Sequence, residues 1–136
     1  MYGRNGFTQY QFVLPKDAGL NGMRLILKRI ADSGLGSFLS VLKVFGLEND
    51  NYLSFPMGGY TLALDFKITT GLFAFLDELD DILADYGGRI YLAKDARMSL
   101  EFFRRGYPKV DEFIQTRVRY GADKAIHSLQ SQRLGL

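Results

Sequence analysis

The segment from Tyr60 to Ile68 alternates at every second position between apolar side chains and polar or small ones. The apolar members are Leu62, Leu64 and Phe66, and the residues between them are Thr61, Ala63 and Asp65. Successive side chains of a β-strand point to opposite faces, so this spacing predicts a strand with one apolar face. Because such a face has to be covered by other elements, the chain is expected to form a sheet with helices packed against it.

Two more strands are predicted before this one. The run from Phe7 to Leu14, closed by Pro15, places Tyr10, Phe12 and Leu14 on one face and Gln9 and Gln11 on the other. The run from Phe38 to Phe45 is rich in aromatic and β-branched residues, and it places Phe38, Leu42 and Val44 opposite Lys43. The polar stretch from Gly46 to Gly59 is expected to be the most flexible loop.

Apolar residues at helical spacing predict two amphipathic helices. The first spans Asp17 to Ser33 and ends at Gly34 and Gly36. Its apolar stripe consists of Leu20, Met23, Ile26, Leu27 and Ile30. The second begins at Thr70 or Gly71 and ends at Tyr86. Its acidic residues are expected to face water and not to be catalytic: Asp77, Glu78, Asp80, Asp81 and Asp85.

The pair Gly87-Gly88 ends the second helix, because glycine adopts the left-handed C-cap conformation without steric cost. A short strand to Ala93 is expected next, and it delivers Tyr91 and Lys94. Three charged residues, Lys94, Asp95 and Arg97, stand at its end, where loops on a rigid scaffold often carry functional sites. The same residues also fit a surface ion-pair cluster, so spacing alone leaves both interpretations open.

This order of elements predicts an α+β fold with the β-α-β-β-α-β topology of ferredoxin-like domains, in which both helices cover one face of an antiparallel sheet. C-terminal helices follow. The other sheet face stays open, and it should gather Gln9, Gln11, Lys43, Thr61, Ala63 and Asp65. After Arg97, the helical pattern contains Phe102, Phe103 and Phe113. These three either complete the core or form an exposed patch that promotes self-association.

Composition narrows the functional classes. The 136 residues are 47% hydrophobic, which is typical of a folded chain, and the formal net charge of +2 gives no strong electrostatic signal for nucleic acid. Cysteine is absent and His127 is the single histidine, so no disulfide, thiol catalysis or Cys- or His-rich metal site is expected. No signal peptide, membrane span or Gly-rich phosphate loop is recognised. The expected location is therefore the cytoplasm, or the membrane periphery if the substrate is lipid-linked.

Three stretches resemble the C-terminal part of FAD-linked oxidases of the vanillyl-alcohol oxidase class. They are Gln9 to Pro15, Ser37 to Gly46 and Gly88 to Arg97, and they are supported by Tyr107-Pro108 and Arg133-Leu134. The resemblance implies that residues 1–88 are a substrate-binding (cap) domain. It also implies that residues 89–136 return to an N-terminal flavin domain that lies outside this sequence and holds most of the FAD.

Carried over residue by residue, the resemblance assigns substrate binding to Gln9, Gln11, Lys43, Thr61 and Ala63. Tyr91 and Lys94 would contact FAD, and Lys94 would be the catalytic residue beside the reacting sugar carbon. Family members that act on a polyprenyl sugar carry Asn and Cys where this chain has Thr61 and Ala63, and an Asp-Pro pair where it has Gly121-Ala122. The substrate is therefore not fixed by the resemblance.

Two functions follow as expectations. The first is oxidation of a secondary alcohol on a sugar or polyol by hydride transfer to FAD. The alternative is a free-standing ferredoxin-like module that binds a small molecule or dimerises without catalysis. RNA binding ranks last, because the open face lacks the exposed aromatic residues on which bases stack.

Overall fold

The structure is a computed structural model that describes residues 3–136. Its elements are β1 (Phe7–Pro15), α1 (Lys16–Ser33), β2 (Ser37–Phe45), β3 (Gly59–Lys67), α2 (Leu72–Asp85), β4 (Arg89–Ile90), the 3-10 turn η1 (Leu92–Lys94), α3 (Leu100–Gly106), α4 (Val110–Arg119), α5 (Ala122–Ala125) and α6 (Leu129–Arg133). The predicted α+β class and the order of the first six elements are confirmed.

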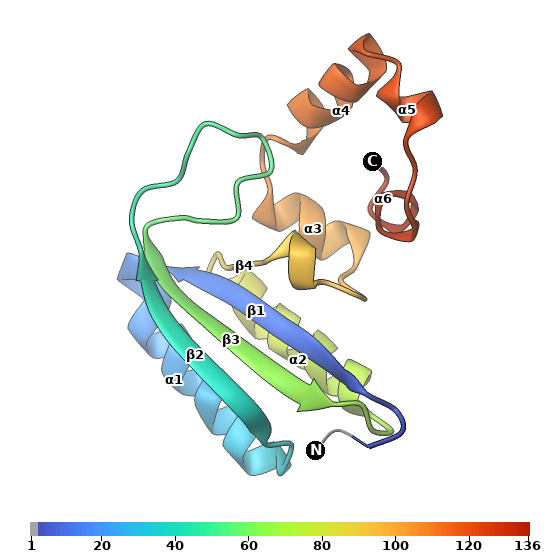
Figure 1. Cartoon of the computed structure of the whole chain (residues 1–136). Coiled ribbons are helices and arrows are strands. Elements are labelled where there is room, and N and C mark those ends of the chain that lie inside the picture. Colours follow the sequence, from blue (N-terminus) through green and yellow to red (C-terminus); the bar gives the residue numbers. More distant parts are fainter. Residues whose placement is uncertain (1–2) are drawn as a thin grey trace.

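The four strands form one antiparallel sheet in the order β2-β3-β1-β4, with β1 and β3 as central neighbours. Helices α1 and α2 lie side by side on the same face of this sheet (Figure 1). This arrangement is the predicted ferredoxin-like layout. The register pairs Phe12 with Leu62 and Tyr10 with Leu64, so the apolar faces of the two central strands coincide and form the core with both helices.

Helix α1 approaches the sheet through glycines. A Cβ atom built on Gly19 would lie 2.6 Å from the Tyr60 ring, and one built on Gly22 would lie 3.0 Å from Tyr86. This close approach rotates the helix relative to the predicted stripe. Met23 and Ile26 are buried as predicted, but Leu20 and Leu27 are 59% and 46% exposed, so that part of the prediction is wrong.

The last strand is shorter than predicted. β4 contains only Arg89 and Ile90, and the chain then turns into η1 instead of continuing to Ala93. The Tyr91 amide still donates a 2.8 Å hydrogen bond to the Gln11 carbonyl, which keeps Tyr91 alongside β1.

The aromatic residues of the C-terminal helices mostly complete the core. Phe102 and Phe103 are 7% and 0% exposed, and Phe113 is half-buried, so the predicted exposed patch does not form there. Large exposed apolar side chains occur elsewhere. On β2 they are Phe38, Leu39, Leu42 and Val44, and between α4 and the start of α6 they are Val118, Tyr120, Ile126 and Leu129. Helices α4 and α5 pair with each other and extend away from the sheet (Figure 1). Within the described residues, no helix is both long enough and apolar enough to cross a membrane.

Phe66 can test which face of β3 is buried, because it is 1% exposed and belongs to the hydrophobic core. Phe66→Ala should lower the free energy of unfolding by about 3–5 kcal/mol, the usual cost of truncating a buried Phe. Asp81→Ala, at an exposed position of α2, is the control and should change it by less than about 0.5 kcal/mol. Chemical denaturation of both variants gives the two values. Comparable losses would contradict the assignment.

Candidate functional site

The open face of the sheet brings together the polar residues that the sequence analysis selected. Across the strands, Gln9 pairs with Asp65, Gln11 with Ala63, and Lys43 with Thr61. The two amides are held in place, since Gln9 Nε2 donates to Asp65 Oδ1 at 2.9 Å and Gln11 Nε2 donates to Thr61 Oγ1 at 3.3 Å. This face is therefore a partly ordered polar surface.

One end of the open face is covered by the loop that joins β2 to β3. Phe55 from this loop is buried and stacks on Tyr91 with the ring centroids 4.5 Å apart, and it meets Phe45 edge-on at 5.8 Å. Composition predicted a flexible polar loop from Gly46 to Gly59 and did not predict that Phe55 is buried in it. Thr61 is 1% exposed, whereas Gln9, Gln11 and Ala63 are half-buried and Lys43 is exposed. A ligand on this face would therefore contact the four more accessible side chains, and not the buried Thr61. These four are Gln9, Gln11, Ala63 and Lys43.

Tyr91 and Lys94 follow β4 and lie along the β4 border of the same face. Tyr91 follows the β4 residue that pairs with Phe12, and its amide bonds to Gln11. Lys94 lines a narrow crevice together with Thr8, Gln9 and Ala96. Its side chain is exposed and makes no ion pair with any residue in the described range 3–136. The fold thus places an unneutralised cation beside the polar sheet face.

Asp95 does not pair with Lys94, although the surface-cluster interpretation would have expected it. Its side chain is only 2% exposed and bonds to Arg133 of α6 at 2.7 Å. It also accepts hydrogen bonds from the backbone amides of Arg97, at 2.9 Å, and Met98, at 2.8 Å. Burial raises the pKa of Asp95, but the hydrogen bonds from Met98, Arg133 and Arg97 outweigh it and hold the pKa below its usual value.

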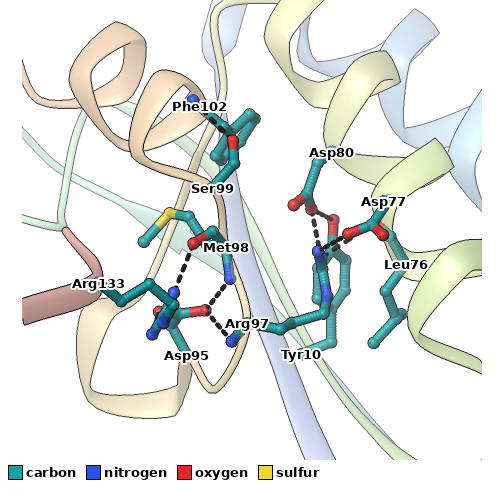
Figure 2. Close-up of polar contacts among 10 residues, drawn as sticks. All are labelled: Tyr10, Leu76, Asp77, Asp80, Asp95, Arg97, Met98, Ser99, Phe102 and Arg133. Carbon is teal, nitrogen blue, oxygen red and sulfur yellow. Dashed lines mark hydrogen bonds and ion pairs between the residues drawn. The ribbon is translucent and has the colours of Figure 1, made fainter. Parts of the chain in front are cut away.

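Arg97 turns in the opposite direction, toward α2 (Figure 2). Its guanidinium donates to Asp80 Oδ1 at 2.7 Å and to the Leu76 carbonyl at 3.0 Å, and it also bonds to Asp77. The hydroxyl of Tyr10 donates to the same Asp80 oxygen at 2.8 Å. Asp95 therefore attaches the segment after η1 to α6, and Arg97 attaches the same segment to α2.

The prediction that Asp80 faces water is wrong, since Asp80 is 5% exposed. It lies on the core-facing side of α2 with Leu76, Leu79 and Leu83, and its charge is compensated by an arginine 17 residues away. Burial raises the pKa of Asp80 to about 6, against the opposing effect of Arg97 and of the hydrogen bonds from Arg97 and Tyr10. Burial likewise keeps the pKa of Tyr10 well above its ordinary value, so its hydroxyl stays protonated.

Comparison with known proteins supports the resemblance inferred from the sequence. The chain is 43% identical over 135 residues to decaprenylphosphoryl-β-D-ribose oxidase of Mycolicibacterium smegmatis, covering 99% of this chain and 29% of that oxidase. It is 38% identical over 115 residues to an uncharacterised protein of Streptomyces coelicolor, covering 84% of this chain and 31% of the relative. Identity to L-gulono-1,4-lactone dehydrogenase of Mycobacterium tuberculosis is 21% over 130 residues, covering 94% of this chain and 30% of that enzyme. No protein-family model matches the chain.

The chain thus spans less than a third of the length of these relatives, and its similarity to the first of them extends over nearly all of its own length. It resembles one segment of an oxidase, and a C-terminal segment fits this coverage. The resemblance to the FAD-linked oxidases, predicted from three short stretches, is confirmed.

The buried position of Asp80 predicts a specific pH dependence of stability. Since its pKa is about 6 in the folded chain and near 4 when unfolded, the folded state binds the extra proton between these values. The wild type should therefore gain stability relative to Asp80→Asn as the pH falls from 7 to 4, by roughly 1–3 kcal/mol. Above pH 7 the difference should be constant. Urea denaturation of both proteins across this range measures it.

Taking the difference between the two proteins removes the contributions of titratable groups that do not interact with Asp80. Tyr10, whose pKa is raised by burial, stays protonated throughout this range. A difference that stays flat, or that shrinks on acidification, would contradict the raised pKa of Asp80.

Proposed function

We propose that this chain is the C-terminal, substrate-facing part of an FAD-dependent oxidoreductase that oxidises a secondary alcohol on a sugar or polyol by hydride transfer to the flavin. The observation that supports the proposal is that Gln9, Gln11 and Lys43 share the open sheet face, and that Tyr91 and Lys94 follow β4 at its border, where Lys94 lines a crevice with Gln9. These are the residues to which the resemblance assigns substrate and flavin contacts.

The relatives support the type of reaction. One is named as an oxidase of a ribose derivative and another as a dehydrogenase of a sugar-derived lactone. In the division that we propose, residues 1–88 form the substrate-binding domain and residues 89–136 return to a flavin domain. The relatives are long enough to contain such a domain, since the matched segment makes up 29% and 30% of their lengths.

The residues of this chain fit one side of a flavin ring. Tyr91 offers a half-buried aromatic ring that is braced by Phe55. Lys94, three residues further along the chain, offers an ammonium group that has no ion-pair partner within residues 3–136. Nothing in the sequence resembles a Gly-rich phosphate loop, so the phosphates and most of the FAD would be held by the flavin domain. Bound there, FAD would supply the hydride acceptor.

The residues of this chain would then orient the substrate. The Lys94 ammonium would donate a hydrogen bond to the oxygen of the reacting hydroxyl and stabilise the alkoxide that forms when the hydroxyl proton passes to a base of the flavin domain or to water. The carbon would then lose its hydride to the flavin, and the oxygen would become the carbonyl oxygen of the product. Gln9 and Gln11 would bind neighbouring hydroxyls through their fixed amides, and Lys43 would bind oxygens at the far edge. Phe55 and Tyr91 would exclude water from one end of the site.

A module that dimerises without catalysis is the second candidate. The observation that favours it is the edge strand β2, which carries four large exposed apolar side chains and only one charge, Lys43. Such an edge tends to pair with another strand. Sedimentation equilibrium of the 136-residue chain should show a dimer that Leu42→Lys disrupts, whereas a strict monomer at high concentration would exclude this candidate.

The protein would act in the cytoplasm, and at the membrane surface if its substrate carries a lipid.

The catalytic assignment of Lys94 can be tested in the full-length enzyme. Lys94→Ala should slow single-turnover flavin reduction at saturating substrate by about 100-fold or more, as expected when a group aimed at developing charge is removed, and it should leave the flavin bound. Gln11→Ala should instead act mainly on KM. Lys28→Ala is the matched control, because Lys28 is an exposed lysine on α1, which covers the opposite face of the sheet. A rate for Lys94→Ala within a few-fold of the wild type would refute the assignment.

A further inference from the structure

The segment from Leu92 to Met98 carries Lys94 on a tight turn. The Lys94 amide bonds to the Tyr91 carbonyl at 2.9 Å, and the Asp95 amide bonds to the Leu92 carbonyl at 3.2 Å. Only three residues are helical here, so local hydrogen bonds alone would leave the turn weakly ordered. Its order has to come from contacts with other elements.

Helix α6 holds one side of the turn. Arg133 bonds to Asp95 Oδ2 at 2.7 Å and also donates to the Met98 carbonyl. Gln130, on the same helix, donates to the Leu92 carbonyl at 2.7 Å and reaches Asp95 at 3.3 Å. The Asp95 carboxylate, which accepts two backbone amides as well, is the centre of this group (Figure 2).

Helix α2 holds the other side. The Arg97 side chain is 12% exposed and lies between Asp77 and Asp80, with its guanidinium carbon 5.8 Å from the centre of the Tyr10 ring. Tyr10 belongs to β1, so this group also connects the turn to the sheet that carries Gln9 and Gln11. Charge-assisted hydrogen bonds from a buried guanidinium are among the strongest in proteins.

Lys94 itself is left out of both groups. Its neighbours Asp95 and Arg97 have polar partners on α6 and α2, whereas the Lys94 ammonium has no ion-pair partner in residues 3–136. A lysine side chain has four rotatable bonds, so its ammonium can be aimed only if its backbone is fixed. An error of about 1 Å at a reacting group can cost about 100-fold in rate.

The geometry points to Asp95, Arg97 and Arg133 as positioning residues, which fix the backbone of Lys94 between α2 and α6 so that its ammonium is directed at the reacting hydroxyl. This inference rests on the proposed function and goes beyond it. It assigns to three residues a role that they perform through Lys94, and it makes α6 part of the site.

A double-mutant cycle in the full-length enzyme tests the inference. Asp95→Asn keeps the size of the side chain and removes its charge, and it should slow flavin reduction at saturating substrate by about 10-fold or more. If Asp95 acts through Lys94, the same substitution in a Lys94→Ala background should change the rate by less than about 2-fold. Asp111→Asn removes a carboxylate from the exposed pair with Arg104, and it is the control for losing an ion pair in the C-terminal helices.

A second measurement does not depend on activity. In the 136-residue chain, ¹⁵N relaxation should show increased motion of the Lys94 and Asp95 amides in Asp95→Asn and in Arg133→Gln, with the amides of β1 and β3 unchanged. Arg133→Lys, which keeps a charge opposite Asp95, should restore part of the order. These readouts separate a local effect on the turn from general destabilisation.

The outcomes distinguish failure of this inference from failure of the proposed function. If no sugar or polyol reduces the flavin of the full-length enzyme, the proposed function is refuted, and the relaxation data then decide alone whether the turn is held by Asp95 and Arg133. A rate for Lys94→Ala equal to that of the wild type refutes the catalytic assignment of Lys94 and overturns this inference with it, because the position of the ammonium would then not matter. Unchanged motion of the turn in both variants overturns the inference. An equal loss of rate from Asp95→Asn in the wild-type and Lys94→Ala backgrounds also overturns it, because Asp95 would then act independently of Lys94.

Discussion

The structure depends on the antiparallel pairing of β1 and β3. In this register Phe12 lies beside Leu62 and Tyr10 beside Leu64, so the two apolar faces are buried together under α1 and α2. Side chains of a strand alternate between faces, and burying one set therefore sends Gln9, Gln11 and Ala63 to the other side. A slip of one residue would bury the amides and expose the core. The hydrophobic effect that forms the core thus also fixes which residues line the candidate site.

A second constraint comes from charges that the fold removes from water. A buried carboxylate is costly unless it is paired and hydrogen-bonded, and both Asp80 and Asp95 meet this condition with arginines distant in sequence. Such pairs contribute less to net stability than to specificity, because each charge accepts few alternative partners. They connect α2, β1 and α6 to the segment around Lys94. The C-terminal helices, which look peripheral in Figure 1, are in this way joined to the border of the open sheet face.

The open face and the position of Lys94 are consistent with the length of the relatives. A partly buried polar surface, with a cation at its border that has no ion-pair partner within residues 3–136, resembles one wall of a binding site. The relatives that share this segment are more than three times as long as the part matched here, since the match covers 29–31% of them. We infer that the opposite wall of the site, including the hold on the flavin, lies in that additional length. The exposed apolar residues of β2 and of α4 and α5 are further surfaces that additional polypeptide could cover.

The sequence alone determined the strand order, the two helices on one face and the residues of the open face, because alternation and helical periodicity are local properties. Only the tertiary structure decided the rest. Because α1 approaches its neighbours at Gly19 and Gly22, it buries a different set of residues from the predicted apolar stripe. Phe55 is buried in a loop that was predicted to be polar. Phe102 and Phe103 are part of the core. The sequence predicted that Asp80 faces water, because its ion-pair partner Arg97 lies 17 residues away. Asp95 pairs with Arg133, 38 residues away, and not with its neighbour Lys94. Charge pairing acts across space, so a pattern read along the chain cannot reveal it.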